Sequence, residues 1–227
     1  MKIEQISDHI WTLKSWMVLE FRVWVVANQD GKGVTLVDAG VGSMAKDILA
    51  FVEQLGKGPI QQILLTHGHS DHVGSVLKIL EHTKVPVYVH PTEIPYMEGD
   101  LPYPRRKKAE QTLPKNVVSP LHIEEGGQLS SFGALQAYSA PGHSPGHVVY
   151  FHEQDRVLLG GDLFTSKKGK LKRPMPMFTA DMQEAIRSSR IVEKLKPERL
   201  EVCHSGPVYH PAIQIASYIE KWSNDNK

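Results

Sequence analysis

The chain has 227 residues, of which 41% are hydrophobic and 22% are charged, and its formal net charge at pH 7 is +1. This length and balance are typical of one globular domain with a sizeable core, and they exclude a chain dominated by basic charge for nucleic-acid binding. Its single cysteine, Cys203, excludes intrachain disulfides and fits a reducing compartment, and no apolar run is long enough to span a bilayer. We therefore expect a cytoplasmic protein that neither inserts into a membrane nor binds nucleic acid. The oligomeric state is left open.

The first half of the chain alternates strand-like and helix-like patterns. Strands are predicted over residues 22–27, 34–38, 61–66 and 85–90. The first two are joined by a segment that contains Asp30-Gly31, a pair that supplies the positive φ of a tight hairpin. One helix is predicted from an N-cap at Ser43 to about Gly56, and a second over residues 72–81.

The second half repeats this order loosely. Strands are predicted around residues 121–124, 128–132, 135–139, 147–152, 157–160 and 200–203. A helix is predicted from Asp181, which forms a capping-box pattern with Glu184, to about Leu195, and a final helix begins at Pro211. Strands followed by helices in each half predict two sheets packed face to face with helices outside. No linker divides the halves, so we expect a single domain over residues 1–227.

The segment His67-Gly68-His69-Ser70-Asp71-His72 directly follows a predicted strand and is the main chemical signal of the sequence. Side chains two apart on an extended segment point the same way, so His67 and His69 can hold one ion. Asp71 and His72 lie where the chain turns into a helix and can face a second ion. Imidazole and carboxylate are ligands that a divalent ion such as zinc prefers.

Three more candidate ligands follow predicted strands further along the chain. His143 lies in a glycine-proline loop, Asp162 ends the run Gly160-Gly161-Asp162, and His204 follows Cys203. Taken singly, each is equally well explained as a turn or cap residue. Together with the first cluster they complete the ligand set of a two-metal site. His147 is expected to begin a strand and to support the site by a hydrogen bond, and Cys203 is expected to be a buried strand residue.

On the motifs HGHSDH, PGHSPGH, GGD and CHSGP, in this order, the chain resembles the metallo-β-lactamase-fold superfamily. The resemblance implies an α/β fold, an αββα sandwich of two mixed β-sheets with helices outside and the metals at one edge. It implies that one ion is bound by His67, His69 and His143, and the other by Asp71, His72 and His204, with Asp162 bridging. Asp38 matches an aspartate that supports the ligand histidines of this family from behind.

Two ions a few ångströms apart hold a shared hydroxide near neutral pH, and that hydroxide attacks a carbonyl or phosphoryl centre. We therefore expect a dinuclear hydrolase of an ester, lactone, thioester or phosphoester bond, with zinc as the default metal, Mn²⁺ or Fe²⁺ as alternatives, and Asp71 and Asp162 as catalytic residues. Two other functions stay open: a mononuclear-iron persulfide dioxygenase, and a non-catalytic metal-stabilised binding module.

Three segments are expected to border the substrate. The first is an apolar flap with Trp16, Met17, Leu19 and Phe21. The second contains Tyr96, Met97, Tyr103 and the basic run 105–108, and the third contains Phe164, the basic run 167–173, Met175, Met177 and Phe178. They predict a small-molecule substrate, anionic with an acyl part, although solvated loop charge explains the basic runs as well. Thr165 stands where quorum-signal lactonases of this fold carry a tyrosine, which argues against efficient lactonase activity.

Overall fold

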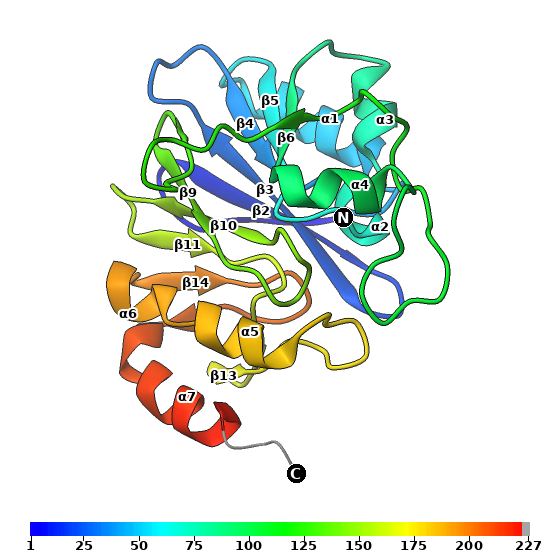
Figure 1. Ribbon diagram of the computed structural model, residues 1–227. Coiled ribbons are helices and arrows are strands. Elements are labelled where there is room, and N and C mark those ends of the chain that lie inside the picture. Colours follow the sequence, from blue (N-terminus) through cyan, green and yellow to red (C-terminus); the bar gives the residue numbers. More distant parts are fainter. Residues whose placement is uncertain (224–227) are drawn as a thin grey trace. The chain divides into compact units, whose positions relative to one another are not determined.

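The computed structural model describes residues 1–223 as two compact units (Figure 1). Unit 1 comprises residues 1–102 and 107–121, and unit 2 comprises residues 103–106 and the described chain from His122 onward. Each unit has its own β-sheet and its own cluster of buried apolar side chains. The single domain over residues 1–227 stays a prediction. None of the described helices is long and apolar enough to cross a membrane.

Unit 1 contains a mixed seven-stranded sheet in the order β1-β2-β3-β4-β5-β6-β7. Its strands are β1 (Lys2–Gln5), β2 (Ile10–Trp16), β3 (Glu20–Ala27), β4 (Val34–Val37), β5 (Ile60–Leu64), β6 (Val87–Val89) and β7 (Ser119–Pro120). Neighbours from β1 to β4 run antiparallel, and neighbours from β4 to β7 run parallel. The predicted hairpin between β3 and β4 is confirmed, with Gly31 at a φ of 68°.

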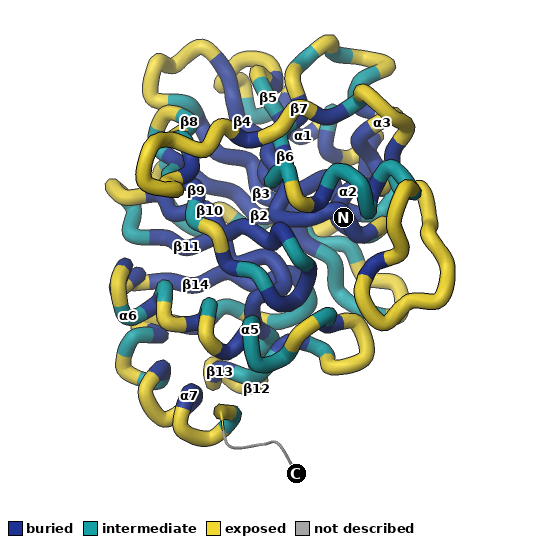
Figure 2. The backbone as a smooth tube through the Cα atoms, viewed as in Figure 1, coloured by how far each residue is buried: buried dark blue, intermediate teal, exposed yellow. Residues whose placement is uncertain are grey.

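The helices of unit 1 bury an apolar face against its sheet. They are α1 (Ala45–Leu55), α2 (Ser70–Val73), α3 (Val76–Leu80), α4 (Ile94–Met97) and the 3₁₀ turn η1 (Pro91–Glu93). Ile48 and Phe51 on α1 share one apolar cluster with Val25 on β3. On β3 the intervening Trp24 and Val26 are also buried, so both faces of this strand are covered (Figure 2). Burial of both faces explains its nearly continuous hydrophobic sequence.

Unit 2 contains a six-stranded sheet in the order β15-β14-β11-β10-β9-β8 and a separate two-stranded hairpin. The sheet strands are β8 (Ser131–Phe132), β9 (Leu135–Ser139), β10 (Val148–His152), β11 (Val157–Leu159), β14 (Arg199–Glu201) and β15 (Val208–Tyr209). Only β11 and β14 pair in parallel. The hairpin consists of β12 (Thr165–Lys167) and β13 (Lys170–Lys172), so part of the predicted basic loop 167–173 is in fact strand.

The helices of unit 2 pack on the apolar cluster that includes Phe151 and Leu158 of its sheet. They are α5 (Met182–Ser188), α6 (Ile191–Leu195), α7 (Ile215–Ser223) and the 3₁₀ turn η2 (Pro211–Ile213). The predicted N-cap at Asp181 is confirmed, since its Oδ1 accepts the backbone N–H of Glu184 at 2.9 Å. Satisfying this amide, which has no partner within the helix, stabilises the first turn.

Two predicted long helices are each divided in two. The helix expected over residues 72–81 breaks between α2 and α3, where the Ser75 hydroxyl donates to the carbonyl of Val41 at 2.7 Å. A Cβ atom at Gly74 would lie 2.8 Å from the backbone nitrogen of Gly42, so the chain passes too close for a larger residue. The helix expected over 181–195 breaks after α5, where the Ser189 hydroxyl donates to the carbonyl of Ile186 at 2.6 Å. Such side-chain bonds compete with continued helix.

Two other local predictions were wrong. Ser43 is not the N-cap of α1, because Met44 occupies that position without a side-chain hydrogen bond. Residues 121–124 do not form a strand, and only an isolated bridge joins Ile123 to Leu129. Gly126 and Gly127, at φ of 93° and 83°, turn the chain back before a longer ladder can form.

Candidate metal centre

In unit 1 the predicted site residues lie at the carboxyl ends of two neighbouring parallel strands. Asp38 follows β4, and Thr66 and His67 come shortly after β5. Because β4 and β5 run parallel, their carboxyl ends lie at the same edge of the sheet. The α2 helix begins at Ser70 and carries Asp71 and His72 in its first turn. The sheet edge therefore brings the first histidine cluster next to Asp38.

Asp38 is fully buried and forms three hydrogen bonds at this edge. Its Oδ1 accepts the backbone N–H of Thr66 at 2.8 Å, and its Oδ2 accepts the Thr66 hydroxyl at 2.8 Å. The same Oδ2 lies 2.8 Å from Nδ1 of His72. A carboxylate can only accept, so Nδ1 of His72 carries the proton and its Nε2 keeps a lone pair. The bonds offset the left-handed backbone of Asp38, whose φ is 58°.

His67 is oriented in the same way through Thr66. The Thr66 hydroxyl, which donates to Asp38, lies 3.1 Å from Nδ1 of His67 and so accepts its proton. Nε2 of His67 then keeps its lone pair and lies 3.0 Å from Nδ1 of His69. Two nitrogens bound tetrahedrally to one zinc ion would lie about 3.3 Å apart, given Zn–N bonds of about 2.05 Å. The spacing of the two rings fits a shared ion.

Two residues that sequence reasoning missed hold the peptide between His67 and His69. Glu93 is fully buried, and its Oε2 accepts the backbone N–H of Gly68 at 3.0 Å. The Thr112 hydroxyl donates to the carbonyl of Gly68 at 2.9 Å. Both lie in segments for which neither a strand nor a helix was predicted. The burial of a single carboxylate there leaves no signal in periodicity or spacing.

Unit 2 uses the same construction at its own sheet edge. Asp162 follows β11, and His204 follows β14, the only parallel pair of this sheet. His143 lies in the loop before β10, which runs antiparallel to β11 and starts at that edge. Oδ2 of Asp162 lies 3.1 Å from Nε2 of His204 and 3.3 Å from Nε2 of His143. One buried carboxylate oxygen thus contacts two imidazoles.

Neighbouring side chains fix the orientation of this half of the site. The Thr179 hydroxyl donates to the carbonyl of Met175 at 2.9 Å and lies 3.4 Å from Nδ1 of His143. Its lone pair faces that nitrogen, which leaves Nε2 of His143 toward Asp162. The backbone N–H of Asp162 donates to Nε2 of His147 at 3.1 Å, and His147 directly precedes β10. This is the supporting bond expected of His147.

A glycine allows α5 to pack against the loop that carries His143. Gly142 has a φ of 130°, and a Cβ atom there would lie 2.1 Å from the backbone nitrogen of Ala185. The backbone N–H of Asp181 donates to the carbonyl of Gly142 at 2.8 Å, and the backbone N–H of Ala180 donates to the backbone carbonyl of His143 at 3.0 Å. The loop is therefore held by backbone contacts that only glycine permits at this position.

Two further features adjoin His204. Cys203 is fully buried and lies two residues after the end of β14. Its sulfur lies within 4.8 Å of a side-chain oxygen of Asp162 and a ring nitrogen of His204. On the other side, Ser205 accepts the backbone N–H of Ser166 at 2.6 Å, and the Ser166 hydroxyl donates to the carbonyl of Gly206. The β12–β13 hairpin is thus bonded to the segment that follows His204.

The predicted substrate rim is only partly exposed. Trp16 and Met17, at the tip of the β2–β3 hairpin, are 74% and 59% exposed, as an apolar flap requires. Met97 is fully buried in the core of unit 1, so its predicted place on the rim was wrong. Arg105 is not a free surface charge either, since its Nη1 donates to the carbonyls of Pro176 and Thr179 at 2.8 and 2.7 Å.

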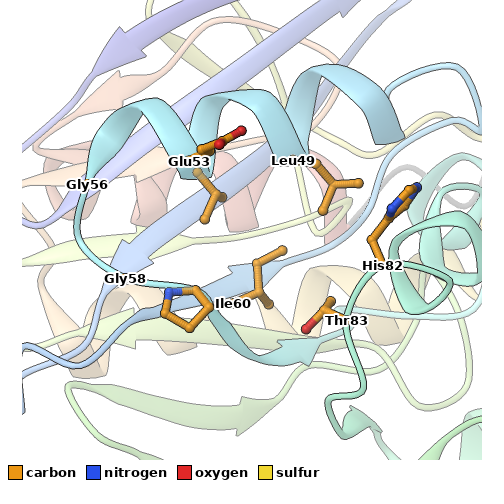
Figure 3. A pocket seen from close by; sticks show the side chains of 9 residues that line it. Leu49, Glu53, Gly56, Gly58, Ile60, His82 and Thr83 are labelled. Carbon is orange, nitrogen blue, oxygen red and sulfur yellow. The ribbon is translucent and has the colours of Figure 1, made fainter.

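The pocket in unit 1 with a volume of about 550 Å³ lies away from the predicted ligands. In Figure 3, Leu49 and Glu53 on α1 lie opposite Ile60 and Thr83. Its wall is mainly apolar, and none of the described residues that line it is a predicted ligand. The predicted metal ligands of this unit therefore lie at the carboxyl edge of the sheet and not in this pocket.

The family model of the metallo-beta-lactamase superfamily matches residues 21–204. The probable metallo-hydrolase YybB of Bacillus subtilis is 34% identical over 226 residues, which cover 98% of this chain and 99% of YybB. A hydroxyacylglutathione hydrolase of Marinomonas sp. is 29% identical over 152 residues, which cover 66% of this chain and 49% of that enzyme.

Solved structures give the same result for the fold. The protein TTHA1623, in a di-iron-bound form, aligns with a TM-score of 0.67 at 27% identity and covers 88% of this chain and 95% of its own. The metallo-beta-lactamase FIM-1 of Pseudomonas aeruginosa, in a mono-zinc form, aligns with a TM-score of 0.70 at 18% identity, over 98% and 96% of the two chains. These similarities confirm the predicted α/β fold class with two mixed sheets and helices.

Proposed function

The chain belongs to the metallo-beta-lactamase superfamily, as its motifs predicted, and is a metal-dependent hydrolase, and from this premise we propose that it works with two divalent ions. His67, His69 and His143 would hold one ion, and Asp71, His72 and His204 the other, with Asp162 bridging. Zinc is the default metal for imidazole and carboxylate ligands, with Mn²⁺ and Fe²⁺ as alternatives.

The observation that carries this proposal is the orientation of the imidazole rings. Nδ1 of His67 donates a hydrogen bond to Thr66, and Nδ1 of His72 donates one to Asp38, so both rings keep a lone pair on Nε2. In unit 2, Nε2 of His143 and Nε2 of His204 both lie next to Asp162. A metal needs neutral rings whose free nitrogens are directed by such outer bonds. The buried donor set therefore fits divalent ions.

When bound, a pair of such ions supplies a hydroxide near neutral pH and polarises the substrate oxygen. The chain's own residues have two further tasks. Asp162 would hold the two ligand sets and the attacking oxygen in fixed positions relative to one another. Asp71, whose side chain is 28% exposed on the first turn of α2, can accept the proton at Oδ2 and return it to the leaving group. Its Oδ2 lies 3.9 Å from Nε2 of His72.

We infer that the substrate is a small molecule with an ester, lactone, thioester or phosphoester bond. A thioester is the first bond to test, because several relatives are named hydroxyacylglutathione hydrolases. An anionic group on the acyl part stays within this proposal, and the exposed Trp16 and Met17 would suit an apolar part.

Elemental analysis and a substrate panel test this proposal together. Purified, reconstituted protein should hold about two divalent ions per chain, as seven ligands require, and should hydrolyse at least one of an S-acyl thiol, a lactone, an aryl ester and a phosphodiester. Chelation should abolish that hydrolysis, and the metal should restore it. Fewer than one ion per chain after reconstitution would rule out the two-ion site. One iron ion per chain, no hydrolysis and oxygen uptake on a persulfide would instead support the mononuclear-iron persulfide dioxygenase.

A further inference from the structure

A second pocket lies in unit 2 between the β12–β13 hairpin and α7, which are neighbours in Figure 1. Its volume is about 570 Å³, within the range of small-molecule sites. The hairpin contributes Lys168, Lys170 and Lys172, and α7 contributes Tyr218 and Lys221, with Gln214, Ser217 and Trp222 among the remaining lining residues. No predicted metal ligand is among the described residues of its wall.

The wall of this pocket carries charge of only one sign. It contains four lysines, and no aspartate or glutamate is found among its described lining residues. Lysines normally occur on surfaces where both signs are mixed, because like charges close together repel each other. The whole chain is nearly neutral, at +1, so this concentration is local. Such a pocket attracts an anion.

A buried hydroxyl group in the same wall has no partner in the folded chain. Tyr218 is only 4% exposed, and its hydroxyl oxygen has no hydrogen-bond partner within residues 1–223. Its ring packs edge-on against Phe164, with centroids 5.3 Å apart. Burial raises the pKa of Tyr218, with Arg173 acting in the opposite direction, so the group stays protonated and can donate. Buried polar groups normally have partners, and Tyr218 belongs to the wall of the pocket that an anion would occupy.

The hairpin is fixed against α7 before any ligand arrives. Gln214 accepts the backbone N–H of Leu171 with Oε1 at 3.0 Å and donates to the carbonyl of Gly169 with Nε2 at 3.0 Å. Lys168 and Gly169 form the two-residue turn, with φ of 53° and 72°. A left-handed conformation is uncommon for lysine and places its side chain beside the pocket. On the opposite side, Nζ of Lys221 lies 4.7 Å from the ring centre of Trp222.

We propose that this pocket binds a small molecule that carries two or more phosphate groups. A phosphate monoester carries a charge of about −1.5 to −2 at pH 7, so about two phosphates balance the four lysines of the pocket. Phosphate oxygens accept bonds from lysine ammonium groups and from the Tyr218 hydroxyl alike. The site is separate from the proposed catalytic centre, since the two share no side chain.

Fluorescence of Trp222 tests the proposal on the metal-loaded protein, with inorganic pyrophosphate as the probe. Titration should change the emission of the wild type, and the change should disappear in Trp222→Phe, which separates this site from binding at the metals. A Lys170→Gln/Lys172→Gln variant should bind pyrophosphate at least about tenfold more weakly, because it loses charge-assisted bonds. A control, Lys46→Gln/Lys57→Gln in unit 1, changes the net charge equally and should bind within about twofold of wild type.

Tyr218→Phe provides a second test that does not alter charge. It should weaken pyrophosphate binding severalfold while the protein remains folded, and inorganic phosphate should bind at least about tenfold more weakly than pyrophosphate because it meets fewer lysines. Equal losses in the pocket and control variants would reduce the effect to general charge and overturn the proposal. A fluorescence change that persists in Trp222→Phe would do the same, because the anion would then bind elsewhere.

Discussion

The hydroxyl oxygen of Thr66 lies 3.1 Å from Nδ1 of His67, and the same hydroxyl donates to Oδ2 of Asp38 at 2.8 Å. A hydroxyl has one proton to donate, and here Asp38 accepts it. His67 must then donate to Thr66, which sets its tautomer. Thr66 thus leaves the lone pair on Nε2 of His67, a proposed ligand nitrogen that it does not contact. In unit 2, Thr179 stands in the same relation to His143, with Met175 as the acceptor.

Thr66→Val should weaken metal binding without unfolding the chain. Valine keeps the shape of threonine but removes the acceptor for His67 and the donor to Asp38, and loss of such supporting bonds lowers metal affinity about 10- to 100-fold. Competition with a chromophoric chelator measures the affinity. Thr12→Val is the matched control, because Thr12 is equally buried in unit 1 and its hydroxyl has no partner within residues 1–223. Equal affinities in the two variants would refute the role of Thr66.

Asp162→Ala should lower hydrolysis by at least about a hundredfold, since one carboxylate organises the charge at the reacting centre. The melting temperature and circular dichroism should show that the variant remains folded. Asp8→Ala, an exposed aspartate of unit 1, should keep wild-type activity. Activity of Asp162→Ala within tenfold of wild type would mean that the bridging ligand has been assigned to the wrong residue.

Gly142→Ala should destabilise the protein by about 3 kcal/mol, the upper end of the range for overpacking. The added Cβ would lie 2.1 Å from the nitrogen of Ala185, so α5 or the His143 loop must move. Gly133→Ala separates this clash from backbone strain, because Gly133 also has a positive φ, 61°, but a Cβ there meets nothing within 4 Å. That control should lose only about 1 kcal/mol. Urea unfolding of both variants measures the difference.

Tyr218→Phe should stabilise the protein by about 1 kcal/mol at neutral pH, because it removes a buried hydroxyl without a partner. Burial raises the pKa of Tyr218 in the folded chain above its unfolded value. Above about pH 10, Tyr218 ionises in the unfolded chain but stays neutral in the folded chain, so the free energy of unfolding falls until the pH passes the folded pKa. The wild type should thus lose unfolding free energy more steeply than the variant above pH 10. Parallel pH profiles would show that Tyr218 does not titrate as described.

The strands could be predicted, and the proposed ligands could be nominated, because their signals are local. Alternating and continuous apolar runs predicted β3, β4 and β10, and the histidine spacing singled out residues 67–72 as proposed ligands. The supporting residues could not be predicted in this way. Glu93 and Thr112 reach Gly68 across 25 and 44 positions of the chain, and no local pattern records such a contact.

Helix ends and the basic run 167–173 were predicted less well for a related reason. The break before α3 depends on a bond from Ser75 to the carbonyl of Val41, a residue more than thirty positions away. Three of the four lysines of the β12–β13 hairpin line a pocket against α7, a placement that the composition of the run did not indicate. The composition of a charged segment does not indicate which part of the folded chain its side chains face.

The two bonds of Ser166, with Ser205 and with Gly206, connect the hairpin of the lysine pocket to the segment that follows the proposed metal ligand His204. We expect these bonds to link occupancy of the lysine pocket and occupancy of the proposed metal site by a single coupling free energy. Equilibrium coupling is reciprocal, so any factor by which pyrophosphate changes metal affinity is the factor by which the metal changes pyrophosphate affinity. Two titrations, each repeated with the other ligand present, yield that factor twice. Removing both bonds with a Ser166→Ala/Ser205→Ala variant should bring it toward one.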